Sequence, residues 1–222
     1  MNILLLDTAT EACSCALSVQ GNLTQRFTLD PRKHAELILP MADDLLQTAG
    51  LTPSDLDAVA FGCGPGSFTG LRIACGVAQG IAFAATIPVI PVSNLAILAQ
   101  MAYAEWGEKQ VLTAIDARLQ EVYWGIYQLD AAGVMVLQGE ECVCPAQQVP
   151  VPISNGWFGM GSGWQAYADV LSQRLAGALT RYKGDVYPTA GAMLPLALQA
   201  LAQGKTVSAA EAMPVYLRNK VV

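Results

Sequence analysis

The sequence predicts an α/β protein built from two similar halves. One observation is a repeated pattern, because LLLDTATEACSCAL near the start and TAIDARLQEVYWGIY near the middle both combine strand, Asp, short turn, Glu and strand. The two copies lie about 109 residues apart, which indicates a duplicated unit. A second observation is the alternating apolar segment LDAVAF, typical of a buried strand, which leads through a glycine-rich loop into a long apolar helix.

The first half is predicted to open with an antiparallel meander. Its strands are expected at 2–6, 12–19 and 23–29, with a polar bend at 7–11. A helix from His34 to Ala49 should end at Gly50, since glycine commonly closes helices in the left-handed conformation. The remaining expected elements are a strand at 56–61, a helix at 71–85 with Ser67 or Thr69 as its N-cap, a strand at 87–92 and a helix at 94–104.

The second half repeats this opening and then becomes less regular. Its predicted elements are strands at 111–115, 122–129 and 134–137, a proline-bearing segment, a glycine turn at 159–163, a helix at 165–176, a short strand near 185–187 and a helix at 191–202. We therefore expect two domains, residues 1–106 and 107–222. The tail from about residue 211 is expected to pack back on the first domain.

The composition predicts that part of the surface is apolar and is covered by another protein chain. Hydrophobic residues make up 53% of the 222 residues and charged ones only 14%, against about a quarter in ordinary globular domains. This excess predicts an apolar face that another protein or a second copy covers. The net charge of −6, with scattered Lys and Arg, argues against direct nucleic-acid binding. We expect a cytoplasmic protein, because the N-terminus lacks a basic leader and the apolar stretch at 73–87 is short for a membrane span.

The glycine-rich segment GCGPGSFTGLR, residues 62–72, is the most distinctive stretch. Glycines allow backbone conformations and close approaches that other residues do not, and the start of the following helix is a potential anion site. The spacing fits neither the dinucleotide-binding fingerprint nor the phosphate-binding P-loop. Two interpretations stay open: a ligand loop that includes Gly64, Gly66 and Ser67, or a sharp turn whose glycines permit tight helix packing.

An aspartate stands at the first bend of each half, Asp7 and Asp116. Actin-like and sugar-kinase-like folds place such residues around nucleotide phosphates and a metal between two lobes. The two glycine loops, the second containing Gly161, would then cover the ligand. The alternative is that both aspartates only cap turns.

The sequence offers few residues for catalysis. Ser67 is not in a GxSxG motif, and the single histidine, His34, is expected to face solvent at a helix start. Cysteines occur at 13, 15, 63, 75, 142 and 144, and their two CxC pairs lack the usual CxxC spacing of zinc sites. We expect free buried thiols, no catalytic residue, no bound metal and no cofactor.

Two consecutive helices carry more apolar surface than one core needs. In the first helix, one apolar stripe contains Ile38, Met41 and Leu45, and Leu46 lies on another side. In the second, Gly76 and Gly80 form a ridge of small residues that permits close helix approach. These residues are the predicted partner interface: Ile38, Met41, Leu45, Leu46, Gly76 and Gly80.

These segments together resemble a known family. LLLDTAT, HAELILP, LDAVAFGCGPGSFTGLRIACGVAQGIA, IPVIPVSNLAILA, AIDARLQEVYWGIY, GSGW and PVYLR are similar to the TsaB family of bacterial tRNA threonylcarbamoyladenosine biosynthesis proteins, from end to end. The resemblance implies the two-lobed ASKHA fold shared by actin, Hsp70 and sugar kinases. It also implies a role in placing threonylcarbamoyl on N6 of the adenosine that follows the anticodon in tRNAs reading A-starting codons.

The resemblance further implies a non-catalytic subunit. TsaD, the catalytic relative, carries an HxxxH metal motif where this sequence has Asn94 and Leu98, and leucine cannot bind a metal. The implied partners are TsaD in a heterodimer, TsaE, and a second copy of the chain when TsaD is absent; tRNA would be contacted only through the complex. The alternatives are an actin-like or sugar-kinase-like ATP-binding enzyme and a glycoprotease-like peptidase.

Overall fold

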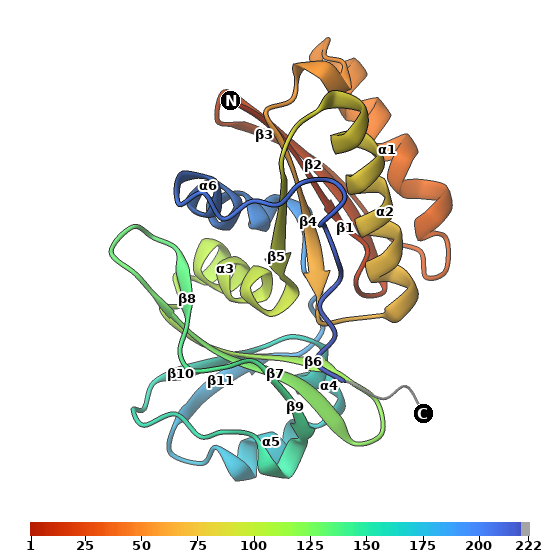
Figure 1. Ribbon diagram of the computed structural model, residues 1–222. Coiled ribbons are helices and arrows are strands. Elements are labelled where there is room, and N and C mark those ends of the chain that lie inside the picture. The colour runs from red at the N-terminus through yellow and green to blue at the C-terminus, as the bar shows by residue number, and fades with distance from the viewer. Residues whose placement is uncertain (219–222) are drawn as a thin grey trace.

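The computed structural model describes residues 1–218, which form two β-sheets with one helix enclosed between them (Figure 1). The first sheet has the order β3-β2-β1-β4-β5. Strands β1 to β3 are antiparallel neighbours, whereas β4 and β5 continue the sheet parallel to β1. The bounds are β1 Asn2–Asp7, β2 Ala12–Val19, β3 Asn22–Leu29, β4 Ala58–Gly64 and β5 Val89–Ser93.

The second sheet has the order β11-β10-β6-β7-β8, and β9 also pairs with β7. Its bounds are β6 Gln110–Asp116, β7 Glu121–Leu129, β8 Met135–Leu137, β9 Cys142–Pro145, β10 Trp157–Met160 and β11 Leu179–Lys183. Strands β6, β7 and β8 are antiparallel, and β10 and β11 run parallel to β6. Counted from β8, this sheet repeats the order and directions of the first. The duplicated two-lobed α/β core and the ASKHA fold class predicted from the sequence are confirmed.

Helices α1, His34–Ala49, and α2, Phe68–Ala85, cover one face of the first sheet. Each is amphipathic, so one face packs on the strands while the other faces outward. Among the described residues, α2 is the one helix long and apolar enough to cross a membrane by length and composition. Its inner face, however, is part of the core, through Leu71, Ala74, Cys75, Ala78 and Ala82. It is therefore a core-forming helix of this fold.

Helix α3, Asn94–Trp106, lies between the two sheets (Figure 1). Leu95 and Leu98 pack into the core of the second sheet, and Ile97 packs into the core of the first. Every residue from 94 to 102 is buried, which is why the segment SNLAILAQMA carries apolar residues on all sides. This helix joins the cores of the two lobes.

The last helix, α6, Leu194–Ala202, packs on the first sheet although it follows the strands of the second. Ala190, Met193 and Ala197 join the core beside α3. The chain therefore returns to the first lobe by Ala190, earlier than the expected position near residue 211. The predicted division at residue 107 lies between the two sheets and groups α6 with the second, whereas α6 packs against the first.

Several predicted elements have different bounds in the structure, because pairing between distant segments determines where they begin and end. Strand β4 extends through the first glycines to Gly64, because β5 pairs with it beyond Phe61. The predicted helix at 165–176 is divided into α4, Ser162–Ala166, and α5, Ala168–Arg174. The strand expected near 185–187 is instead β11, which pairs parallel to β10.

His34 is buried, and its Nε2 lies 3.2 Å from the Ala12 carbonyl oxygen. The expectation of a solvent-facing histidine is wrong.

A buried polar cluster connects β1, β4 and α3. The Asn94 amide donates to the Asp7 carboxylate and its oxygen accepts from Gly64 N at 2.8 Å. Ala9 N donates to the other Asp7 oxygen at 3.2 Å. Gly62 is required above the pair, because an added Cβ would lie 2.1 Å from the carboxylate. Burial raises the pKa of Asp7 from its ordinary 3.8 to about 7, and the hydrogen bonds from Ala9 and Asn94 offset part of that rise.

This raised pKa predicts a pH-dependent stability. Below about pH 4 both folded and unfolded states hold the Asp7 proton, and stability falls as pH rises toward about 7, because only the unfolded state ionises freely. Each pH unit in that window removes up to roughly 1.4 kcal/mol. Asp7→Asn stays neutral, so its free energy of unfolding relative to the unaltered chain should rise between about pH 5 and about pH 8 in urea titrations.

The exposed aspartate Asp169 on α5 provides the matched control. Asp169→Asn should shift stability by the same small amount at both pH values. If Asp7→Asn behaves like this control, the carboxyl does not titrate in the folded protein as described.

Candidate functional site

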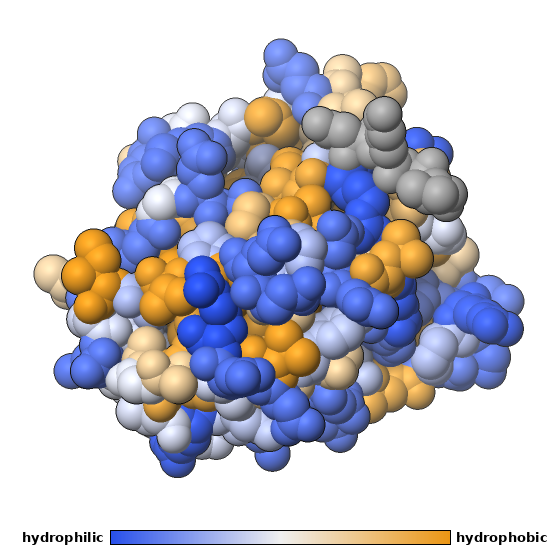
Figure 2. Space-filling view, turned by 90° about the horizontal axis from the view of Figure 1, so that it is seen from below, coloured by the Kyte–Doolittle hydropathy of each residue, from blue (hydrophilic) through white to orange (hydrophobic). Residues whose placement is uncertain are grey.

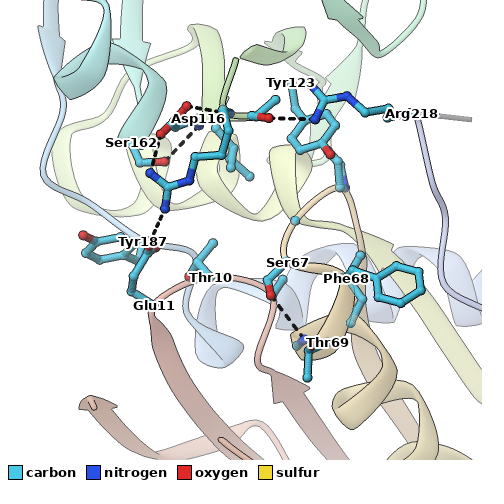
Figure 3. A pocket seen from close by; sticks show the side chains of 18 of the residues that line it. Thr10, Glu11, Ser67, Phe68, Thr69, Asp116, Tyr123, Ser162, Tyr187 and Arg218 are labelled. Atoms are coloured by element: carbon cyan, nitrogen blue, oxygen red, sulfur yellow. Dashed lines mark hydrogen bonds and ion pairs between the residues drawn. The ribbon is translucent and has the colours of Figure 1, made fainter. Parts of the chain in front are cut away.

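A cavity of about 910 Å³ opens between the two lobes. Figure 3 shows side chains from both lobes facing each other across it. One wall comes from the β1–β2 turn and the start of α2, the other from the β6–β7 turn and α4. The labelled lining residues are Thr10, Glu11, Ser67, Phe68, Thr69, Asp116, Tyr123, Ser162, Tyr187 and Arg218.

The glycine loop forms the first-lobe wall and is held tightly against the β1–β2 turn. Ser67 N donates to Ala9 O at 2.7 Å, and the Thr8 hydroxyl donates to Gly70 O at 2.7 Å. A Cβ at Gly66 would lie 2.4 Å from Ala9 O, and one at Gly70 would lie 1.9 Å from Thr8 O. These glycines are needed for backbone contact between two turns. The packing interpretation accounts for them without a ligand.

Ser67 begins α2 as its N-cap. Its Oγ accepts from Gly70 N at 3.4 Å, which satisfies one of the amide groups left free at a helix start. Of the two predicted caps, Ser67 is confirmed and Thr69 is wrong.

On the opposite wall, Asp116 already has protein partners for both carboxylate oxygens. Arg118 donates to it from its backbone at 2.8 Å and from its guanidinium at 2.9 Å, and the Tyr167 hydroxyl donates at 3.1 Å. The Arg118 guanidinium also reaches Glu11 of the first lobe at 3.3 Å. These charges pair with one another across the cavity, so both Asp116 carboxylate oxygens have partners within the chain.

The chain's last described segment closes one side of the cavity. The Tyr216 ring lies 5.4 Å from the Phe68 ring, and its hydroxyl accepts from Arg72 Nε at 3.2 Å. Arg218 then donates to the Ala117 carbonyl at 2.9 Å and pairs with Glu121 in the second lobe. The tail expected from about residue 211 thus contacts the first lobe through Tyr216 before it reaches the second lobe at Arg218, and residues 219–222 lie outside the described residues.

The structure gathers only half of the predicted nucleotide-site residues. Gly66, Ser67 and Asp116 line the cavity, whereas Asp7, Gly64 and Gly161 do not. Asp7 is fully buried beneath Gly62. The tail covers Gly64, since a Cβ there would meet the Val215 carbonyl at 2.4 Å. Gly161 lies against the Ala114 carbonyl, where a Cβ would be 2.3 Å away.

Sequence reasoning found Asp116 but missed three other charged residues of the cavity and its rim. Glu11, Arg118 and Arg218 come from segments more than 90 residues apart and meet only in the fold. One local signal existed for Arg118, which lies in the turn of the second repeated unit. Residues 118–120 all have positive φ, from 54° to 64°, in that turn.

A separate apolar groove of about 340 Å³ runs along the outer faces of α1 and α2. Its lining is Leu39, Pro53, Gly76, Val77, Gly80, Ile81 and Ala84. Gly76 and Gly80 open directly on it, since nothing lies within 4 Å of an added Cβ at either position. Phe83, on α2, is 81% exposed and Leu39 is 52% exposed.

The predicted interface residues of α1 require a correction. Ile38, Leu45 and Leu46 are buried in the core of the chain itself, at 0%, 1% and 5% exposure, so they have no surface for a partner. Met41 is half-buried beside them. The stripe Ile38, Ala42, Leu45 follows the sheet-facing side of α1, and the outward apolar residue is Leu39. Gly76 and Gly80 are exposed as expected.

The lower face of the second lobe carries apolar side chains in a different arrangement from the α1–α2 groove. Figure 2 shows separate apolar patches there among hydrophilic residues. Two of the exposed apolar side chains of this chain, Ile153 and Val151, lie in the loop before β10.

Comparisons with known proteins place the chain in a family. Residues 28–222 match the family model described as TsaD, tRNA N6-adenosine threonylcarbamoyltransferase. The tRNA threonylcarbamoyladenosine biosynthesis protein TsaB of Escherichia coli is 46% identical, over all of this chain and 96% of that protein, and TsaB of Haemophilus influenzae is 42% identical over 100% and 95%.

Solved structures agree with this assignment. YeaZ from Pseudomonas aeruginosa superposes with a TM-score of 0.91 at 49% identity, covering 97% of this chain and 99% of that one. A second Pseudomonas aeruginosa crystal structure, described as similar to the peptidase YeaZ, gives the same score and identity. Identity of this level over the full length, with the same fold, shows that the chain belongs to the TsaB family of tRNA threonylcarbamoyladenosine biosynthesis proteins.

Proposed function

We propose that this chain is a non-catalytic subunit in the biosynthesis of threonylcarbamoyladenosine in tRNA. It binds and stabilises or regulates TsaD, which transfers threonylcarbamoyl from threonylcarbamoyl-AMP to N6 of the adenosine 3′ to the anticodon, together with TsaE. The observation that carries this proposal is the exposed apolar groove on α1 and α2.

The groove has the properties of a helix-packing surface. Gly76, Gly80 and Ala84 follow one another at four-residue spacing and leave room for a partner backbone, while Leu39 and Phe83 provide apolar side chains beside them. Because the chain itself matches the TsaD family model, TsaD should present similar helices, and the two would pair about a pseudo-two-fold axis. Without TsaD, the same face would join two copies of the chain.

The residues at the positions of the TsaD metal motif support a non-catalytic role. The Asn94 side chain donates a hydrogen bond to Asp7 and accepts one from Gly64 N. Leu98 is fully buried and packs near Gly161. Neither residue lines the cavity between the lobes. The residues present at these positions therefore do not fit a metal ion.

We further propose that the chain acts in the cytoplasm, where tRNA is modified, and reaches tRNA only through the complex. A net charge of −6 opposes direct phosphate binding. Arg118 and Arg218, at the cavity, are each paired with a carboxylate of the chain.

Gly76→Glu should abolish TsaD binding without unfolding the chain. The new side chain enters open space in the free protein, but it would bury an unpaired carboxylate in the proposed interface, at a cost of several kcal/mol. Affinity measured by calorimetry should fall roughly a hundredfold or more, and tRNA modification by the mixture should fall with it.

Ala104→Glu, on the exposed side of α3, is the matched control and should leave binding unchanged. Leu45→Glu is unsuitable, because Leu45 is in the core. If Gly76→Glu binds TsaD normally while its melting temperature is unchanged, α2 is not the interface.

Ser67→Ala tests the peptidase alternative. Loss of the N-cap should lower the free energy of unfolding by about 1 kcal/mol, whereas the modification rate of the reconstituted TsaD–TsaE mixture should stay the same. Thr69→Ala removes a hydroxyl from the same loop without removing the cap and should leave stability unchanged. A rate loss of about tenfold or more with Ser67→Ala alone, at full complex assembly, would assign chemistry to this serine.

Calorimetry with Mg-ATP tests the ATP-binding alternative. The isolated chain should give no binding heat, because Asp7 is buried and Asp116 is paired with Arg118. Binding that is weakened by Arg118→Ala would instead favour an actin-like nucleotide site.

A further inference from the structure

The turn between β6 and β7 holds three consecutive residues in the left-handed region of backbone conformation. Arg118, Leu119 and Gln120 have φ values of 61°, 54° and 64°. For residues with a Cβ this conformation is disfavoured by contact with the following carbonyl oxygen, and it normally occurs at single positions rather than in runs. Leu119 is 70% exposed, so its own packing contributes little. Contacts from other segments must therefore offset the cost of this turn.

The C-terminal tail holds the turn from outside its hairpin. The Arg218 guanidinium donates to the Ala117 carbonyl oxygen at 2.9 Å and pairs with the Glu121 carboxylate. One side chain thus binds both residues that flank the left-handed run. The side chains of Arg218 and Glu121 are only 24% and 31% exposed, so water and salt screen this ion pair less than a pair on the open surface.

The same tail is anchored separately on the first lobe. Val215 N donates to Cys63 O at 2.7 Å. Tyr216 packs on the Phe68 ring and accepts a hydrogen bond from Arg72, whose guanidinium carbon lies 3.8 Å from the centre of that ring. These anchors belong to β4 and α2, whereas the turn belongs to the second sheet. Figure 3 shows Arg218 at the second lobe and Phe68 at the first on the same side of the cavity.

We propose that residues 215–218 form a strap, anchored on the first lobe at Tyr216, that holds the β6–β7 turn in its left-handed conformation through Arg218. Release of the strap lets the turn relax and frees the cavity wall that contains Arg118. Because Arg118 pairs with Glu11 across the cavity, release also loosens this link between the lobes. The strap lies at the cavity and not at the α1–α2 groove, so the inference does not depend on the proposed function.

Glycine substitution measures the cost of the turn, because glycine adopts positive φ without a Cβ contact. In urea titrations of the full chain, Leu119→Gly should raise the folding equilibrium constant roughly fivefold. In an Arg218→Ala background, where the turn is free to relax, this gain should fall below about twofold. Gln20→Gly is the matched control, since Gln20 has a φ of 51° in the β2–β3 turn. It should give the same gain in both backgrounds.

Tyr216→Ala tests the strap from its first-lobe end. Tyr216 is anchored on α2, so its loss affects the turn only through the tail. Exchange of the Arg118 and Glu121 amide hydrogens, both bonded within the turn, should become at least about fivefold faster by NMR. Amides of the β2–β3 hairpin should exchange at an unchanged rate. Tyr216→Phe keeps the ring on Phe68 and should retain most of the protection.

Three outcomes contradict the strap. The first is an absence of any gain from Leu119→Gly in the unaltered tail, which would mean that the turn carries no conformational cost. The second is a gain that persists undiminished with Arg218→Ala. The third is unchanged exchange of both turn amides in folded Tyr216→Ala, which would show that the first-lobe anchor does not act on the turn.

Discussion

The enclosure of α3 between the two sheets is the constraint on which the rest of the structure depends. Leu95 and Leu98 pack into one core and Ile97 into the other, so the lobes share a single buried helix. Its first turn is fixed by Asn94, which joins the Asp7 carboxylate to Gly64 N. The ends of β1 and β4, and with them the glycine loop, are therefore held in place from inside the protein.

The same constraint decides which polar side chains line the cavity between the lobes. A side chain that ties β1 to α3 in the core cannot also reach a ligand, and this is the position of both Asp7 and Asn94. The remaining charges at the cavity, including Asp116 and Arg118, satisfy one another. The two-lobed architecture and its cleft persist, while the polar groups that line the cleft serve the fold.

An exposed apolar surface lies instead on the outside of the molecule. Helix α2 uses one face for the core and leaves the Gly76–Gly80 face open, which a protein partner of similar helices would cover. Helix α3 and the tail through Arg218 both connect the two lobes.

Periodicity, turn residues and the internal repeat were sufficient to predict the α/β class, the duplicated core, the bounds of α1 and an N-cap at Ser67 or Thr69, because these depend on interactions between residues near in sequence. The tertiary structure decided which apolar stripe of α1 is core, since Ile38 and Leu45 are distinguished from Leu39 only by the sheet beneath them. It also decided the pairing of Glu11 with Arg118, the return of α6 to the first lobe and the exposure of Cys142 rather than Cys13. Each of these depends on contacts between segments distant in sequence, and local pattern carries no information about which distant segment will provide the partner.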